Sequence, residues 1–357
     1  MMMGHRYLEI DYTKGILTAG MVFGHVVLIL GNGQGRLIRM ALLLPCLATY
    51  SGFLFCFGFA VWVSYLSKPR MRWASILKTA LKCYLAFIAS GFAWKTLALG
   101  QHAGWKLLLS LCFLRDIPSY SEFLLSFSII MIAAAVAAPA MELFTRNKTN
   151  LATSTLAFLA FTLLPKEAIY DPLVGLFLGG SGFFYFPALP YMPLFLLGVY
   201  FARRSHDYDM PAAAIALLVV AIYGGLEMAR ISLRRFPPSA VWILSSAALT
   251  YLYYGAGRWI DVFSPNVVKR YLSAVGQHVL YYLLVSNLIL FGAAALGVGG
   301  TLRQSQVVIF YLGLMIFLFC IQCLTMDLDK VHRSTPAPKP EVHPGSPPKT
   351  PLAGLRS

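Results

Sequence analysis

Apolar segments of about membrane-spanning length recur along this chain, and they constrain the fold more than any other feature. A helix needs roughly 20 residues to cross the hydrocarbon core of a bilayer. Hydrophobic residues make up 58% of the chain and charged residues only 12%, which excludes an ordinary soluble domain. We therefore expect an all-α protein, a polytopic transmembrane helical bundle of about ten spans. The predicted spans are 14–31, 40–65, 77–98, 122–143, 150–165, 185–202, 211–229, 239–257, 275–298 and 307–325.

Two shorter apolar pieces and a C-terminal tail complete the predicted organisation. Residues 105–114 and 172–184 are too short to cross a bilayer alone, so we expect interfacial or re-entrant segments there. The tail is rich in proline and poor in large apolar side chains, which is typical of disorder. The sequence therefore predicts a transmembrane domain at 1–330 and a disordered tail at 331–357, with any chemistry inside the helical bundle.

Lys and Arg residues beside the spans predict the orientation, because basic loops tend to stay in the cytoplasm. With ten spans, the larger share of these residues falls on one side, together with both termini, which we therefore expect in the cytoplasm. The net charge of +15 comes from residues that flank apolar spans and form no continuous patch. This distribution favours anionic lipid head groups as partners and excludes nucleic acid.

Few ionisable residues lie inside the predicted spans, and each is a functional candidate because a charge in the bilayer is expensive. Lys14 and His25 are eleven residues apart, so on a helix they lie within about 20° of the same face and about 16 Å apart along the axis. Asp11 precedes Lys14 at the i, i+3 spacing that allows pairing. A neutral histidine at this depth can accept a proton, while a lysine at the mouth can hold an anionic ligand.

This pattern predicts one solvent-accessible groove that joins Lys14 to His25 and that a long thioester can thread, as in a membrane-embedded transferase. The spacing alone fits a structural role equally well, with His25 hydrogen-bonded to a neighbouring helix and Lys14 reaching the head groups. A proton-coupled transporter or flippase is the functional alternative, with His25, Glu227 and His278 along the path. A catalytically inert scaffold would leave the alignment of Lys14 with His25 unexplained.

The stretch EIDYTKGILTAGMVFGHVV resembles the opening of the acyltransferase-3 family of integral membrane acyltransferases. The first helix of that family carries an Asp, then Arg or Lys, then ten residues and a His, a motif that Asp11, Lys14 and His25 match. D-x-x-K-G is similar to members that resemble fucose 4-O-acetylases. YSGFLFCFGF, FPALPYMPLFLLGVYFARR and LSAVGQHVLYYLLVSNLIL resemble later helices, so the likeness covers most of residues 1 to 325. Asn287 stands near the point where many members have a histidine.

The resemblance implies O-acetyl transfer from acetyl-CoA, or a similar acyl-CoA, to a hydroxyl of a cell-surface, exported or lipid-linked glycan. His25 would then be the general base, or carry the acyl group, while Lys14 binds the CoA and Asp11 orients Lys14. No metal is expected, and the resemblance favours a bacterial inner membrane. Four residues at the edges of spans are the candidates for acceptor binding: Arg36, Arg39, His278 and Glu122.

Overall fold

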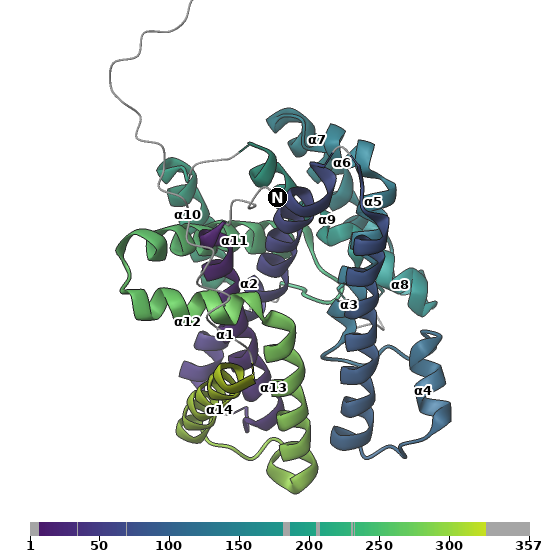
Figure 1. Ribbon diagram of the computed structural model, residues 1–357, viewed down its shortest axis with the longest axis vertical. Coiled ribbons are helices and arrows are strands. Elements are labelled where there is room, and N and C mark those ends of the chain that lie inside the picture. The colour runs from purple at the N-terminus through teal and green to yellow at the C-terminus, as the bar shows by residue number, and fades with distance from the viewer. Residues whose placement is uncertain are drawn as a thin grey trace, which may run out of the picture.

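The computed structural model describes residues 7–325, except 34, 69, 181–185, 205–207, 230, 232 and the side chain of Arg36. The predicted disordered tail, 331–357, lies outside the described residues. The described part is helical throughout (Figure 1), apart from loops and one isolated backbone bridge. Its α-helices are α1 (Leu8–Leu30), α2 (Arg36–Val61), α3 (Trp73–Ala93), α4 (Trp105–Cys112), α5 (Glu122–Val136), α6 (Ala138–Phe144), α7 (Lys148–Ala160), α8 (Pro172–Leu178), α9 (Ala188–Arg204), α10 (Met210–Met228), α11 (Ala240–Phe263), α12 (Asn266–Gln277), α13 (Val279–Ala293) and α14 (Gln304–Thr325).

Short helical turns of other kinds extend or join these helices. A bilayer supplies no hydrogen bonds to the backbone, so a spanning segment must satisfy its own donors and acceptors as a helix. Three α-helices continue as π-helical turns, and two single 3-10 turns lie between α7 and α8. The π-helical turns are η1 (Trp62–Leu66), η2 (Trp94–Ala98) and η5 (Ala294–Val298), and the 3-10 turns are η3 (Phe161–Leu163) and η4 (Lys166–Ala168).

Six of the described helices are long and apolar enough to cross a membrane. They are Leu8–Leu30, Leu37–Leu66, Trp73–Ala98, Met210–Met228, Val279–Val298 and Gln304–Thr325, and each overlaps a predicted span. The pair α5 and α6 would make a seventh, but it is bent by 90° where a single span at 122–143 was predicted. The helical membrane bundle is therefore confirmed, whereas the predicted count of ten spans is not.

Three of the predicted spans do not meet the length and hydropathy expected of a crossing helix. At 150–165 the chain forms only the 13-residue α7 and a 3-10 turn, and at 185–202 the 17-residue α9. Most side chains of α9 are buried in the protein. The third, at 239–257, becomes α11, whose 24 residues include Arg258 and Asp261 near the end. A buried core helix and a lipid-facing span are both apolar, so hydropathy alone does not separate them.

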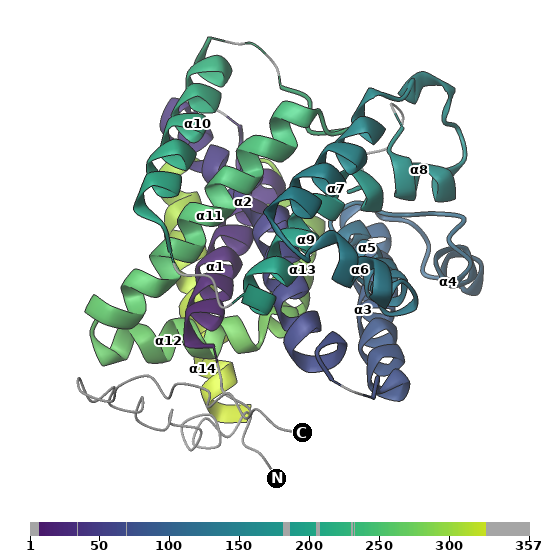
Figure 2. The same cartoon turned by 90° about the horizontal axis from the view of Figure 1, so that it is seen from above.

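Glycines allow α2 and α9 to pack closely at the centre of the bundle. A methyl group at Gly58 of α2 would overlap the carbonyl oxygen of Phe195, and one at Gly198 of α9 would overlap that of Phe55. Because both helices carry a glycine at the crossing, their backbones approach to a distance that no side chain permits. Figure 2 shows α4 and α8 at the periphery, outside this central region.

A helix that the sequence did not predict, α12, covers the beginning of α1. It was expected as part of a loop and of the span 275–298, but it forms a separate amphipathic helix. Figure 1 shows α12 roughly perpendicular to α13 and leading into its first turn, and α12 packs extensively on α1. A side chain at Gly276 would overlap the carbonyl oxygen of Asp11, and one at Gly15 that of Leu272, so the two backbones meet at the Lys14 end of α1.

Small residues also leave open space beside α1. Gly20 of α1 faces the ring of Pro45 in α2, and Gly24 faces Leu42, with room for a methyl group in both places. Pro45 supplies no backbone donor to the helix, and its carbonyl accepts from the Thr49 hydroxyl at 2.6 Å. Gly20 and Gly24 therefore face α2, and the space beside them forms part of a cavity.

Candidate active site

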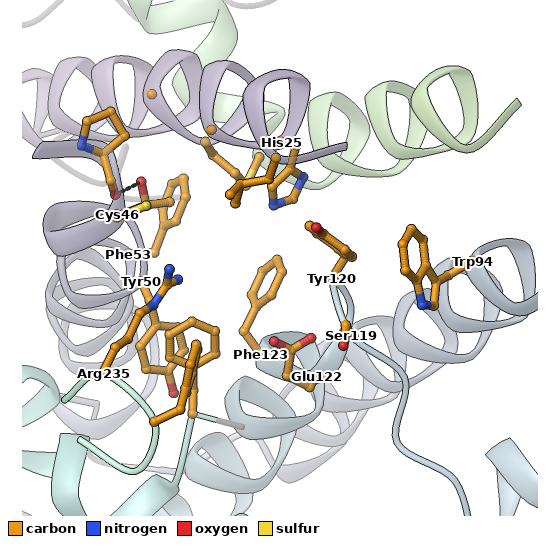
Figure 3. A pocket seen from close by; sticks show the side chains of 18 residues that line it. His25, Cys46, Tyr50, Phe53, Trp94, Ser119, Tyr120, Glu122, Phe123 and Arg235 are labelled. Atoms are coloured by element: carbon orange, nitrogen blue, oxygen red, sulfur yellow. Dashed lines mark hydrogen bonds between the residues drawn. The ribbon is translucent and has the colours of Figure 1, made fainter. Parts of the chain in front are cut away.

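A partly enclosed cavity of about 400 Å³ lies beside the second half of α1. Its walls come from α1, α2, η2, α5 and the three loops that precede α5, α9 and α11, which are distant in sequence (Figure 3). The lining is mainly aromatic and aliphatic, with His25, Glu122 and Arg235 as its ionisable groups beside Cys46 and the tyrosines. This size and this mixture of apolar wall with few polar groups are typical of sites for small ligands.

His25 projects from α1 toward the cavity, and its ring is held on two sides. Nδ1 lies 2.7 Å from Oδ1 of Asn287 on α13. The imidazole meets the ring of Tyr120 edge to face, with centroids 5.3 Å apart and an interplanar angle of 86°. His25 is thereby fixed in one orientation by residues that are far from it in sequence.

The amide orientation of Asn287 determines which His25 nitrogen carries the proton. The Asn287 Nδ2 donates to Oγ of Ser90 at 3.2 Å and to the carbonyl oxygen of Tyr120 at 3.3 Å. Both partners face the amide nitrogen, so Oδ1 faces the imidazole and can only accept. Neutral His25 therefore donates from Nδ1 and keeps its lone pair on Nε2, which has no hydrogen-bond partner among the described residues.

Two further ionisable groups of the cavity are incompletely paired. Glu122 begins α5, and its Oε2 is buried without a hydrogen-bond partner in the described structure. The Arg235 guanidinium lies 4.8 Å from the ring centroid of Phe236 and 5.3 Å from that of Phe186. The Arg235 Nε is also buried without a partner, and no described carboxylate forms an ion pair with this residue. Since unpaired buried charges are expensive, both groups are suited to a ligand that supplies the missing partners.

The structure places Lys14 and Asp11 at the other end of α1, outside this cavity. Nζ of Lys14 lies 2.7 Å from Oδ1 of Asp11, at the spacing read from the sequence. The cavity begins at Gly20, and Lys14 is not among the described residues that line it. The expected groove from Lys14 to His25 is therefore not part of this cavity. Thr18 and Met21, which continue the same helix face between them, are both buried.

The other predicted acceptor residues divide in the same way. Glu122 lines the cavity with His25. Arg39 is exposed in the first turn of α2, and His278 lies between α12 and α13, so neither is part of the cavity wall. The side chain of Arg36 lies outside the described part of the chain. Glu227 accepts from the Tyr223 hydroxyl at 3.3 Å and from the backbone of Leu233 at 3.4 Å, a structural role in the loop before α11.

Sequence reasoning missed three contributors to the cavity, namely Arg235, Tyr120 and the role of Asn287. In the sequence Arg235 is only a basic residue between two apolar segments, and Asn287 stands out only as a departure from a family pattern. Tyr120 precedes Glu122 in a segment without a recognisable motif. The one available signal was the departure at Asn287, because a polar amide inside an apolar span needs a partner.

Chemically, the arrangement presents a proton acceptor, Nε2 of His25, to an enclosed apolar space with one guanidinium and one carboxylate. This combination suits removal of a proton from a nucleophile that is bound away from bulk water. No group of three or more His, Cys, Asp or Glu side chains that could hold a metal ion occurs in the described ranges.

Residues 6–225 match the family model described as "heparan-alpha-glucosaminide N-acetyltransferase, catalytic". The match covers more than half of the chain, from α1 to most of α10, and includes Lys14, His25 and Glu122. Arg235 and Asn287 lie beyond it. No curated protein and no solved structure matches the chain significantly.

This match supports a membrane acyltransferase but not the acyltransferase-3 family that the motifs resemble, so that assignment is corrected. Only the Lys-x10-His pattern was specific, and the other similar stretches were apolar helices that many membrane proteins share. The match also decides between the enzyme and the transporter interpretations, in favour of the enzyme.

Proposed function

Because the chain belongs to the heparan-alpha-glucosaminide N-acetyltransferase catalytic-domain family and is therefore an acyl-transferring enzyme, we propose that it moves an acetyl group from acetyl-CoA to a glycan in the His25 cavity. The observation that carries this proposal is the imidazole of His25, whose Nδ1 is held by Asn287 at 2.7 Å while Nε2 stays available. The acceptor group is an amine or a hydroxyl. O-acetylation, which the sequence motifs suggested, and N-acetylation, which the family name suggests, use the same base.

In the proposed reaction, the acceptor attacks the carbonyl carbon of the thioester as Nε2 of His25 takes its proton. A bond from nitrogen or oxygen to carbon forms, and the carbonyl oxygen becomes an oxyanion. When the tetrahedral intermediate collapses, the carbon–sulfur bond breaks and the imidazolium returns the proton to the CoA sulfur. General-base catalysis of this kind typically contributes about 10²- to 10⁴-fold to the rate.

Lys14 is our candidate for the phosphate end of CoA. It is paired with Asp11, retains 25% side-chain exposure, and lies on the same helix face as His25. The separation along α1 is about 16 Å. Met21, a flexible side chain on this face, lines the cavity, so we propose that it moves when the pantetheine arm passes toward His25. Replacement of Lys14 by Met should then raise the KM for acetyl-CoA and leave kcat largely unchanged.

Glu122 and Arg235 are our candidates for acceptor binding. The free Oε2 of Glu122 can accept a hydrogen bond from a hydroxyl or an ammonium group, and Arg235 can donate to sugar oxygens or to an acidic substituent. The aromatic wall around them supplies apolar surface for the faces of a sugar ring. Glu122 and Arg235 would bind the acceptor from the side of the cavity opposite His25.

The test uses the full-length protein in detergent or nanodiscs with labelled acetyl-CoA and matched glycans that differ only in an amine or a hydroxyl. Wild type should yield labelled product with at least one acceptor, and His25→Gln should abolish it without loss of the folded protein. His102→Gln changes an exposed histidine and is the matched control. Transfer by His25→Gln and His25→Ala at wild-type rates would overturn the assignment of the base.

A further inference from the structure

The hydroxyl of Tyr120 lies beside His25 and has no role in the scheme above. Tyr120 lines the cavity from the loop between α4 and α5. We infer that this hydroxyl is the oxyanion donor of the acetyl transfer: it donates a hydrogen bond to the former carbonyl oxygen in the tetrahedral intermediate. The inference rests on the proposed function and adds a catalytic residue to it.

The position of the Tyr120 ring is determined by three aromatic neighbours. Its centroid lies 5.3 Å from that of His25, 4.8 Å from that of Trp94 and 6.2 Å from that of Phe291. Figure 3 shows the ring rising from its loop toward His25, with the hydroxyl at the end nearer the imidazole. A thioester carbon placed for attack beside His25 would therefore have its oxygen within reach of this hydroxyl.

The backbone at Tyr120 supports a functional reason for this placement. Its φ is +66°, a left-handed conformation that bulky residues rarely adopt and that concentrates at functional sites. The Tyr120 carbonyl accepts from Nδ2 of Asn287, the amide that also orients His25. An ion pair at 2.7 Å between Asp116 of the same loop and Lys95 of η2 also connects this loop to η2. Asn287 thus positions the base and the hydroxyl relative to each other.

The protonation state of Tyr120 suits a hydrogen-bond donor. Burial raises its pKa above the usual value, and nearby Glu122 and Cys46 act in the same direction, whereas Arg235 opposes them. The phenol consequently keeps its proton at neutral pH. Its hydrogen also has no acceptor among the described residues, so it is available to a ligand.

Other hydroxyl and cationic groups of the cavity are less suited to this task. The Thr49 hydroxyl already donates to the carbonyl of Pro45. Arg235 lies across the cavity from His25 in Figure 3, beside Tyr50. Tyr120 is therefore a donor at the His25 end of the cavity. In the proposed step it keeps its proton: the hydrogen bond strengthens as negative charge develops on oxygen and weakens when the carbonyl re-forms.

The experiment compares Tyr120→Phe with wild type and with Tyr170→Phe, which removes the hydroxyl of an exposed tyrosine. Loss of one oxyanion donor typically lowers kcat by about 10²- to 10³-fold. We expect this loss for Tyr120→Phe with both KM values unchanged, because the thioester oxygen becomes charged only after binding. The ring contacts remain, so the thermal midpoint should stay near that of wild type.

Four results separate the outcomes. A kcat of Tyr120→Phe within twofold of wild type would overturn the inference, and so would an increase in acceptor KM with unchanged kcat. If Tyr120→Phe is unstable, a fluorinated tyrosine at position 120 keeps the ring and acidifies the phenol; its activity should then decline at a lower alkaline pH than that of wild type, and an unchanged profile would contradict us. Absence of transfer by wild type would instead refute the proposed function.

Discussion

At the scale of single residues, the chemistry depends on one amide that reaches three partners. Asn287 accepts from Nδ1 of His25 and donates toward Ser90 and the Tyr120 carbonyl. It is itself fully buried. Its role resembles that of the residue that orients the histidine in other acyl-transfer sites, where the wrong tautomer abolishes the base.

We predict that Asn287→Leu lowers kcat by about 10²-fold, because the free imidazole can then place its proton on Nε2. The buried Nδ1 also loses its acceptor, which should reduce the free energy of unfolding by about 1–3 kcal/mol. Steady-state kinetics and thermal unfolding measure the two effects. Asn266→Leu alters an exposed asparagine of α12 and should change neither quantity. Wild-type kcat in Asn287→Leu would show that the tautomer does not matter.

Arg235 offers a second prediction, on acceptor binding. Its guanidinium is held by aromatic faces and has a free buried Nε. A hydrogen bond to a charged group is worth about 1.5–3 kcal/mol, so Arg235→Gln should raise the acceptor KM at least about tenfold. The KM for acetyl-CoA should not change. Arg234→Gln replaces the exposed neighbour and is the control; equal acceptor KM values in both variants would exclude Arg235 from the acceptor site.

At the scale of helices, close backbone crossings hold the walls of the cavity in place. The crossing of α2 with α9 depends on Gly58 and Gly198, each of which faces a carbonyl oxygen of the other helix. α2 also packs on α1, so a displacement at this crossing would reach the cavity.

We predict that Gly198→Ala destabilises the protein by about 1–3 kcal/mol, because its methyl group must displace the α2 backbone. The matched control is Gly313→Ala in α14, where an added methyl group meets open space. At that position alanine should be neutral or slightly stabilising, since it favours the helix. Thermal unfolding in the same detergent compares the two, and equal midpoints would contradict the importance of the crossing.

At the scale of the whole molecule, α1 and α14 run in opposite directions. The end of α1 meets the start of α14, where the amide nitrogen of Leu302 donates to the carbonyl of Leu30 at 2.9 Å. Near the other end, Gln322 donates to the carbonyl of Ala274 on α12, which covers the beginning of α1. The first turn of α1 and the last turn of α14 therefore lie at the same end of the bundle.

This arrangement predicts a topology that reporter fusions can check. A reporter placed after residue 325 should be cytoplasmic, and one in the loop 99–104 should lie on the opposite side. The end of η2 contacts η5, so the loop 99–104 and the loop before α14 share one end of the molecule. A cytoplasmic signal from both positions would contradict the arrangement. An external signal at 325 would leave the bundle intact but place Lys14 away from cytoplasmic CoA.

Much of the fold class was predictable, because membrane insertion depends on local composition. The spans at α1, α2, α3, α10, α13 and α14 follow from length and hydropathy. The predicted number of spans was too high where an apolar segment is buried inside the protein, as in α9, or where it bends, as between α5 and α6.

Composition and spacing in the sequence indicate a helical membrane protein with a histidine deep in its first span and, on the same helix face about 16 Å away, a Lys14–Asp11 pair. These features depend on spacing within one helix, which is set by local geometry. The folded structure adds that Asn287, 262 residues away, orients His25, and that Tyr120, Glu122 and Arg235 share its cavity. These neighbours come together because whole helices pack against each other, and that packing is not encoded in any local sequence pattern.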